Sequence, residues 1–278
     1  MPMSNGNIDS KTVKSFGDEW QRFDQANVSN AELSKGFSEY FSVFPWNIVD
    51  IESVGFDMGC GSGRWARFVA PKVGHLNCID PSLAIHVAEK ELNSFNNISF
   101  FNESVSNNSL IDGSQDFGYS IGVLHHVPDT VNAIKSCVKL LKPGAPFLLY
   151  LYYNLDNSPY FYKAIWRVSN IFRRIISKKP LVIKNLITDM IAIFLYLPLA
   201  VLSKLLDSLN VSVDHIPLSY YRNRSFYTMR TDSRDRFGTP LERRFNKEEI
   251  KDMMTNSGLE NIKFSDDKPF WCAVGIKK

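Results

Sequence analysis

The stretch that decides the fold is VGFDMGCGSGRW, residues 54–65, which joins an apolar run to a glycine-rich turn and the start of a helix. Glycines at positions 59, 61 and 63 let the backbone approach a ligand closely and adopt torsions that other residues disfavour. Asp57 adds a carboxylate where the expected strand ends. The stretch therefore predicts a pocket for a nucleotide-like cofactor after the first strand of an α/β fold.

The spacing of the glycines separates two classes of cofactor. A dinucleotide-binding turn has its third glycine three residues after the second, and Arg64 occupies that position here. Asp57 would repel a diphosphate but would suit the ammonium group of an amino-acid-like ligand. The turn therefore argues against a dehydrogenase. It resembles the first motif of the class I S-adenosylmethionine-dependent methyltransferases, and its candidate cofactor-binding residues are Asp57, Gly59, Cys60, Gly61, Ser62 and Gly63.

A second acidic position follows the next expected strand, His75–Asp80. A carboxylate at the tip of that strand can accept hydrogen bonds from both hydroxyls of a ribose. The alternative is a cap for the following helix, and both roles are compatible if Ser82 provides the cap. We expect Asp80, Pro81 and Ser82 to contact the cofactor.

The resemblance to class I methyltransferases extends along the chain, to bacterial proteins of the type 11 and type 12 groups. The run QDFGYSIGVLHHVPD, residues 115–129, is similar to the family's fourth motif, and KLLKPGA, residues 139–145, is similar to its turn into the fifth strand. The resemblance implies that Gly122 and Val123 line the methionine part of S-adenosylmethionine, and that Ser104 and Val105 border its adenine. Glu103 lies one position from the family's usual adenine-binding acid. The matches cover about residues 53–153.

Two adjacent histidines are the candidate catalytic residues. The family's cofactor carries an activated methyl group, so the enzyme mainly aligns an acceptor and excludes water. A hydroxyl acceptor gains from a general base near neutral pKa, which His126 or His125 could supply. The alternative role for each is to tie the loop to the backbone by hydrogen bonds.

Alternating expected strands and helices predict an α/β fold with a doubly wound, mostly parallel, seven-stranded sheet of the Rossmann-like methyltransferase type. We expect an N-terminal helical cover over residues 1–50 and a cofactor-binding core over 51–153. A helical insertion or lid is expected over 154–236. Residues 237–278 should form a C-terminal helix and a strand pair, Ile262–Ser265 and Trp271–Ile276, that complete the core.

The insertion carries an apolar block, Met190–Leu202, beside basic residues. The block is shorter than the roughly 20 residues that span a bilayer, and Pro198 interrupts it. We expect a buried helical pair, with an interfacial helix resting on a membrane as the alternative. Later in the insertion, aromatic and basic side chains suit a polar or anionic acceptor, or else a solvated loop with ordinary salt bridges. These candidate substrate-binding residues are Tyr220, Tyr221, Arg222, Arg224 and Arg230.

Composition limits the partners and the compartment. A formal net charge of +3 over 278 residues, without a long basic block, argues against nucleic acid. The four cysteines are widely spaced, which favours reduced thiols and a cytoplasmic protein, and the N-terminal residues show no signal-peptide pattern. The five histidines form no metal-binding pattern. Peripheral contact of Met190–Leu202 with the inner face of the membrane is the alternative location.

These observations predict an S-adenosylmethionine-dependent methyltransferase. The first expectation is O-methylation of a small hydroxylated metabolite or sugar. Methylation of a lipid-linked acceptor at the membrane surface is the second. A non-catalytic cofactor-binding module is the alternative from another class.

Overall fold

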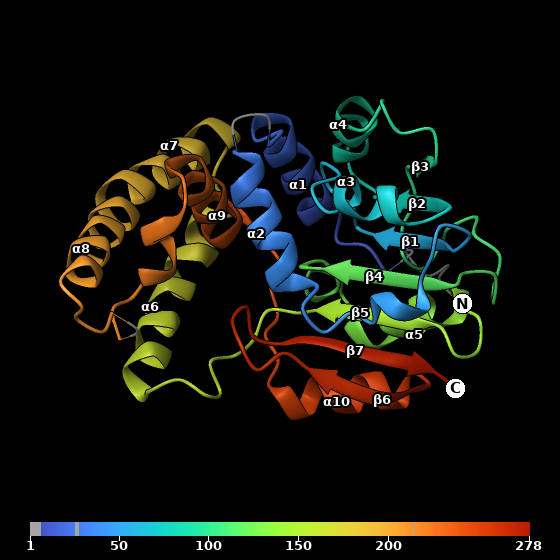
Figure 1. The fold of residues 1–278 in the computed structure, drawn as a ribbon. Helices are drawn as coiled ribbons and strands as arrows, with labels where there is room; N and C mark the ends of the chain where they lie inside the picture. The colour runs from blue at the N-terminus through green and yellow to red at the C-terminus, as the bar shows by residue number, and fades with distance from the viewer. Residues whose placement is uncertain (1–6, 26–27, 214) are drawn as a thin grey trace. The chain divides into compact units, whose positions relative to one another are not determined.

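The structure, a computed structural model, describes residues 7–25, 28–213 and 215–278. The described chain divides into two compact units (Figure 1). The core unit comprises residues 7–25, 33–156 and 241–278, and the helical unit comprises residues 28–32 and 157–240. The sequence predicted an insertion over 154–236, and the helical unit is displaced from that range by a few residues at each end.

The core unit is built on a seven-stranded sheet with the order β3-β2-β1-β4-β5-β7-β6. Its strands are β1 (Val54–Met58), β2 (His75–Ile79), β3 (Ile98–Phe101), β4 (Phe117–Ile121), β5 (Pro146–Tyr150), β6 (Leu259–Phe264) and β7 (Cys272–Lys277). The first five pair in parallel, whereas β7 runs antiparallel to both β5 and β6. The prediction of a doubly wound, mostly parallel sheet is confirmed. The chain order reverses between β1 and β4, so the carboxyl ends of these strands border the switch point where α/β folds bind ligands.

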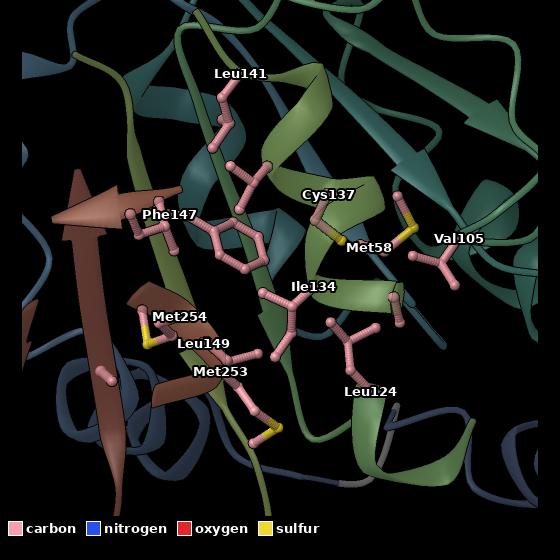
Figure 2. Packing of buried hydrophobic residues seen from close by; sticks show 14 of the residues in the cluster. Met58, Val105, Leu124, Ile134, Cys137, Leu141, Phe147, Leu149, Met253 and Met254 are labelled. Carbon is pink, nitrogen blue, oxygen red and sulfur yellow. The ribbon is translucent and has the colours of Figure 1, made fainter. Parts of the chain in front are cut away.

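Helices cover both faces of the sheet. The core unit contains α1 (Ser10–Arg22), most of α2 (Asn30–Tyr40), α3 (Ala66–Val69), α4 (Ala84–Glu91), α5 (Thr130–Leu140) and α10 (Lys247–Asn256), with short 3₁₀ turns η1 (Trp46–Ile48), η2 (Ala70–Lys72) and η3 (Leu124–His126). On one face, Ile134 of α5 and Met254 of α10 pack against Phe147 of β5 (Figure 2). On the other face, Ile85 of α4 packs in a cluster with Phe37 of α2. Alternating side chains of each strand therefore serve two hydrophobic cores.

Two elements of the core unit differ from the expected boundaries. The helix after the glycine turn, expected from Arg64, spans only Ala66–Val69 and tightens into η2, because Pro71 has no N–H to continue the ladder. Strand β6 begins at Leu259 rather than Ile262. The pairing of β6 with β7 shifts register between Glu260 and Lys263. The alternation of apolar and polar residues is therefore interrupted near the start of β6, although the strand is already paired there.

The helical unit consists of long helices joined by short turns. They are α6 (Tyr160–Ile176), α7 (Leu181–Ile191), the π-helical turn η4 (Ala192–Tyr196), α8 (Leu197–Ser208), the 3₁₀ turn η5 (Ser219–Asn223) and α9 (Phe226–Gly238). Figure 1 shows α7 and α8 following one another as one long helical run.

The expectation of a buried helical pair around Met190–Leu202 is wrong. The residues belong to one continuous run, Leu181–Ser208, and most of its apolar side chains are exposed. Pro198 does not break the run because it lies in the first turn of α8, directly after the π-helical turn that changes the hydrogen-bond register.

Candidate cofactor and acceptor site

The glycine turn after β1 is held by the end of β2. The backbone N–H groups of Gly59 and Cys60 donate to the Ile79 carbonyl over 2.7 and 3.1 Å. Gly59, Gly61 and Gly63 all have positive φ, between 55 and 81°, which is the backbone region that favours glycine. The alternate glycines are thus required by the path of the turn.

Asp80 ties the turn to the start of the next helix. Its Oδ2 accepts a hydrogen bond of 3.0 Å from the Gly61 N–H, and its Oδ1 accepts bonds from the backbone N–H (2.8 Å) and hydroxyl (2.6 Å) of Ser82. The Ser82 hydroxyl oxygen accepts from the Ala84 N–H at the first turn of α4. Burial raises the pKa of Asp80, and the bonds from Ser82 and Gly61 oppose that shift. Asp80 and Ser82 therefore shape the turn, while their contact with a ribose, and that of Pro81, stays a prediction.

Asp57 lies buried under the same turn without a full set of partners. Its side chain is 2% exposed, and its Oδ2 has no hydrogen-bond partner in the structure. Burial raises its pKa to about 8, with the nearby Tyr119 hydroxyl opposing the shift and Asp80 adding to it. The Ser62 hydroxyl is also buried and unpartnered. Polar groups left unsatisfied in this way fit a site that a polar ligand completes.

Helix α1 lies over these motifs, where the aromatic and acidic residues 15–23 suggest either core packing or a helix over the cofactor. Trp20 approaches the turn so closely that a Cβ at Gly61 would lie 3.2 Å from its indole nitrogen, and a Cβ at Gly17 would lie 3.3 Å from the Leu83 backbone. The Phe16 ring meets the His126 ring edge-on, with 4.9 Å between centroids. Phe16 and Gly17 lie four and three residues before Trp20, so they lie with it on one face of the helix and form a shared contact surface.

The turn after β3 is joined to β2 by Asn102, another residue that the sequence did not single out. Its side-chain amide donates to the carbonyls of Asp80 and Ser82, over 3.0 and 3.1 Å. Ser104 and Val105, the candidate adenine neighbours, are both buried, and Val105 belongs to the hydrophobic cluster of Met58 (Figure 2). Their contact with adenine stays a prediction.

The tip of β4 meets the glycine turn. A Cβ at Gly59 would collide with the Val123 side chain, so the two motifs touch. Gly122 has a φ of 76° and donates its N–H to the Tyr150 carbonyl, and a Cβ there would meet nothing nearer than 4.0 Å. The open space beside Gly122 is compatible with its predicted place along the cofactor.

The two histidines of η3 have different surroundings. His126 Nδ1 lies 2.6 Å from the Leu241 carbonyl oxygen, so Nδ1 carries the proton of the neutral ring and Nε2 is the accepting nitrogen. His125 is fully buried against Tyr152, and neither ring nitrogen has a hydrogen-bond partner. Burial, with His126 and Arg244 nearby, keeps the pKa of His125 well below its ordinary value. His126 is therefore oriented for proton transfer, and His125 is a neutral packing neighbour.

An ion pair lies beside the histidines and was not predicted. Arg244 Nε is 2.9 Å from Glu242 Oε1, and its guanidinium lies 5.3 Å from the centre of the Tyr152 ring. The Arg243 N–H donates to the His125 carbonyl. The segment that returns to the core unit thus frames the histidine turn. Among the described residues, no group of three or more His, Cys, Asp or Glu side chains could hold a metal ion.

The five candidate substrate-binding residues all lie in the helical unit, and their side chains pair within it. The Tyr221 hydroxyl donates to Asp232 over 2.8 Å, and Arg224 donates to the Tyr220 hydroxyl over 2.7 Å. Arg222 pairs with Asp207 over 3.1 Å. Arg230 makes two bonds of 3.1 Å to the Asp189 carboxylate. These contacts give the residues a structural role, and their binding of an acceptor stays a prediction.

Part of the chain resembles a known protein family. Residues 56–149, about a third of the 278-residue chain, match the family model of the methyltransferase domain. None of the curated proteins compared with the chain matches it.

Solved structures resemble the chain over most of its length. A SAM-dependent methyltransferase of Thermotoga maritima is 14% identical, with 95% of this chain and 100% of that chain covered and a TM-score of 0.50. A chain from the complex between the Haloferax volcanii Trm112 methyltransferase activator and a methyltransferase is also 14% identical. The match covers 95% of this chain and 97% of that chain, with a TM-score of 0.55. At identities this low, the similarity of the structures shows a shared fold and not a shared function.

Proposed function

We propose that the chain is a class I S-adenosylmethionine-dependent methyltransferase, an interpretation that the match of residues 56–149 to the methyltransferase-domain family supports. Its core unit binds S-adenosylmethionine and methylates a hydroxyl group of a small metabolite or sugar. The observation that carries the cofactor assignment is the pair of buried, unpartnered polar atoms under the glycine turn, Asp57 Oδ2 and Ser62 Oγ. When bound, S-adenosylmethionine supplies a methyl group already activated as a sulfonium.

The turn residues hold the cofactor in this proposal. The ionised Asp57 carboxylate pairs with the cofactor's ammonium group, and the open position beside Gly122 accommodates the methionine chain with Val123. Asp80 Oδ2 keeps one lone pair beyond its bond to Gly61, because Oδ1 already accepts two bonds from Ser82, and this lone pair accepts a ribose hydroxyl. Ser104 and Val105 border the adenine. Trp20 covers the turn and excludes water from it.

His126 acts on the acceptor. Its Nδ1–H is held by the Leu241 carbonyl, so Nε2 takes the proton of the acceptor hydroxyl as the oxygen is methylated. Phe16 packs against the ring and restricts its orientation. His125 stays neutral and supports the ring of His126, whose centroid lies 3.9 Å away.

A lipid-linked acceptor is the second candidate. The observation that favours it is the apolar surface of the helical unit, where every exposed side chain over residues 181–202 is apolar. Such a surface would bring the protein to the place where lipid-linked acceptors are found. Location in the cytoplasm, at the inner face of the membrane, is part of this second proposal.

Incubation with methyl-labelled S-adenosylmethionine and fractionated cell extract tests the function. A labelled product that survives removal of protein and nucleic acid, with the label on oxygen, is the expected result. Label confined to the lipid fraction would favour the second candidate. Cofactor binding without transfer to any fraction would leave the chain a non-catalytic cofactor-binding module and overturn both.

A further inference from the structure

The helical unit buries an apolar cluster that includes Tyr196 and Phe237, yet it also exposes more apolar surface than is expected for a protein domain surrounded by water. Over residues 181–202, the exposed side chains are all apolar, and they include Val182 (79% exposed) and Phe194 (72%). The buried side chains of the same stretch include Lys184 and Thr188. Exposed apolar side chains on one continuous helix face are too many to be the scattered ones that all soluble proteins carry.

The polar side of this run is explained by α9. Arg230 forms its paired bonds with Asp189, Arg234 Nε donates to Asn185 over 3.0 Å, and the Ser233 hydroxyl donates to the Thr188 carbonyl over 2.8 Å. These contacts join α7 to α9 through polar groups that are buried or half-buried. The apolar side of α7 and α8 is therefore the side left for an external partner.

Helix α6 repeats this arrangement. Its exposed apolar residues recur with helical spacing at Phe161, Ile165, Val168, Phe172 and Ile175. Arg173 is buried on the other side, where its guanidinium donates to the carbonyls of Thr239 and Pro240 over 2.9 and 2.8 Å. Two successive helical segments thus expose apolar faces and bury polar ones.

Exposed positive charge borders the apolar face of α6. Arg167 and Arg174, seven residues apart, lie on the same side of the helix, and Lys178 and Lys179 follow its end. None of the exposed residues of α6 is acidic. Apolar side chains flanked by basic ones match the surface of a membrane with anionic head groups. The acyl region accommodates the apolar side chains, and the phosphates attract the basic ones.

From these observations we propose that the helical unit docks onto an anionic lipid bilayer, with the apolar faces of α6, α7 and α8 in one leaflet and the run Leu181–Ser208 lying parallel to the membrane plane. Among the described residues, this is the one helix long and apolar enough to cross a membrane, and only 28% of its most apolar 18-residue window is buried. Crossing would carry the Asp189–Arg230 pair and the rest of the polar α9 interface into the hydrocarbon, which is costly. A helix in the plane keeps that interface on the protein side.

Flotation of the full chain with vesicles tests the docking. The wild-type protein should float with vesicles of phosphatidylcholine and phosphatidylglycerol, and V182S/L186S/F194S should lower the bound fraction about tenfold or more. I111S, which changes an exposed apolar residue of the core unit (75% exposed), should bind like the wild type. R167Q/R174Q should weaken binding to anionic vesicles and reduce its salt dependence, with little effect on neutral vesicles.

Fluorophore labelling tests the orientation. The four native cysteines are buried, so single cysteines at Val182, Phe194 and Leu205 can be labelled selectively. Quenchers placed at different depths in the bilayer should report similar depths for all three positions. A much deeper position 194 would show a spanning helix and overturn the in-plane arrangement.

Two results would overturn the docking itself. One is the absence of wild-type flotation. The other is a vesicle-independent dimer that V182S/L186S/F194S separates into monomers, because the apolar face would then bind a second copy. Docking does not rest on methyl transfer. Binding of S-adenosylmethionine by the same variants, measured without vesicles, distinguishes failure of the docking proposal from failure of the proposed function.

Discussion

The backbone N–H of Gly61 donates a hydrogen bond of 3.0 Å to Oδ2 of Asp80, so the glycine turn after β1 and the acidic tip of β2 form one unit. The same carboxylate holds Ser82 at the entry to α4. One side chain thus fixes the positions of two loops that the proposed cofactor must contact together.

Replacement of Asp80 by Ala should weaken S-adenosylmethionine binding by about 1.5–3 kcal/mol, because charge-assisted hydrogen bonds are lost and the turn is no longer anchored. Isothermal titration calorimetry measures the change. The control is Asp112→Ala, which removes an exposed acid paired with Lys139 in the same unit. Unchanged affinity in a folded Asp80→Ala protein would remove Asp80 from the ribose role.

The buried Asp57 should make the cofactor-free protein less stable as pH rises. Its pKa is raised from 3.8 to about 8, so between these values the folded protein holds a proton that the unfolded chain has released. Stability should fall across that range by up to about 6 kcal/mol, at about 1.4 kcal/mol per unit of pKa shift. Asp57→Asn should therefore raise the melting temperature more at pH 8 than at pH 5, and it should weaken cofactor binding. An equal effect at both pH values would contradict the buried, protonated carboxyl.

Cofactor binding near pH 7 should release a proton from Asp57, because a bound ammonium group favours the ionised carboxylate. Calorimetry in buffers of different ionisation enthalpy measures the release directly. The proton release should disappear in the Asp57→Asn variant, measured at a cofactor concentration at which the variant still binds. Release that persists in the variant would assign the proton to another group.

Substitution of His126 by Gln should lower kcat by roughly 100-fold or more while cofactor affinity changes little, because the side chain acts as the general base on the acceptor. The control is His86→Gln, in a side chain that is 62% exposed on α4. The loss should be smaller at high pH for acceptors with acidic hydroxyls, which ionise without help. Equal turnover in wild type and His126→Gln would leave the histidine with a structural role only.

Replacement of Arg230 by Ala should destabilise the helical unit by about 0.5–2 kcal/mol, since its bidentate pair with Asp189 is partly shielded from water. A double-mutant cycle with Asp189→Ala, followed by thermal unfolding, isolates the pair. The two losses should be non-additive. A large rise in KM for the acceptor without a stability change would instead support Arg230 as an acceptor-binding residue.

Much of the core unit could be predicted from local sequence. The alternate glycines at 59, 61 and 63 all adopt positive φ, and Asn246 caps α10 with Glu249 in a reciprocal pair, as local spacing indicates. The exposure of the apolar side chains of the helical run Leu181–Ser208 could not be predicted in this way. Hydrophobic periodicity identifies an apolar face but does not say whether that face points inward, and here Lys184 rather than Phe194 is buried.

The sequence by itself determined the fold class and the order of the cofactor motifs, because strand periodicity, glycine torsions and helix caps are encoded within a few neighbouring residues. Only the tertiary structure decided which atoms of the site are satisfied. His126 is oriented by a carbonyl 115 residues away, and Asp57 is buried by segments from elsewhere in the chain. The tertiary structure also decided which side of α7 is exposed, because α9 supplies the hydrogen-bond partners for the polar side of α7 and leaves its apolar side exposed.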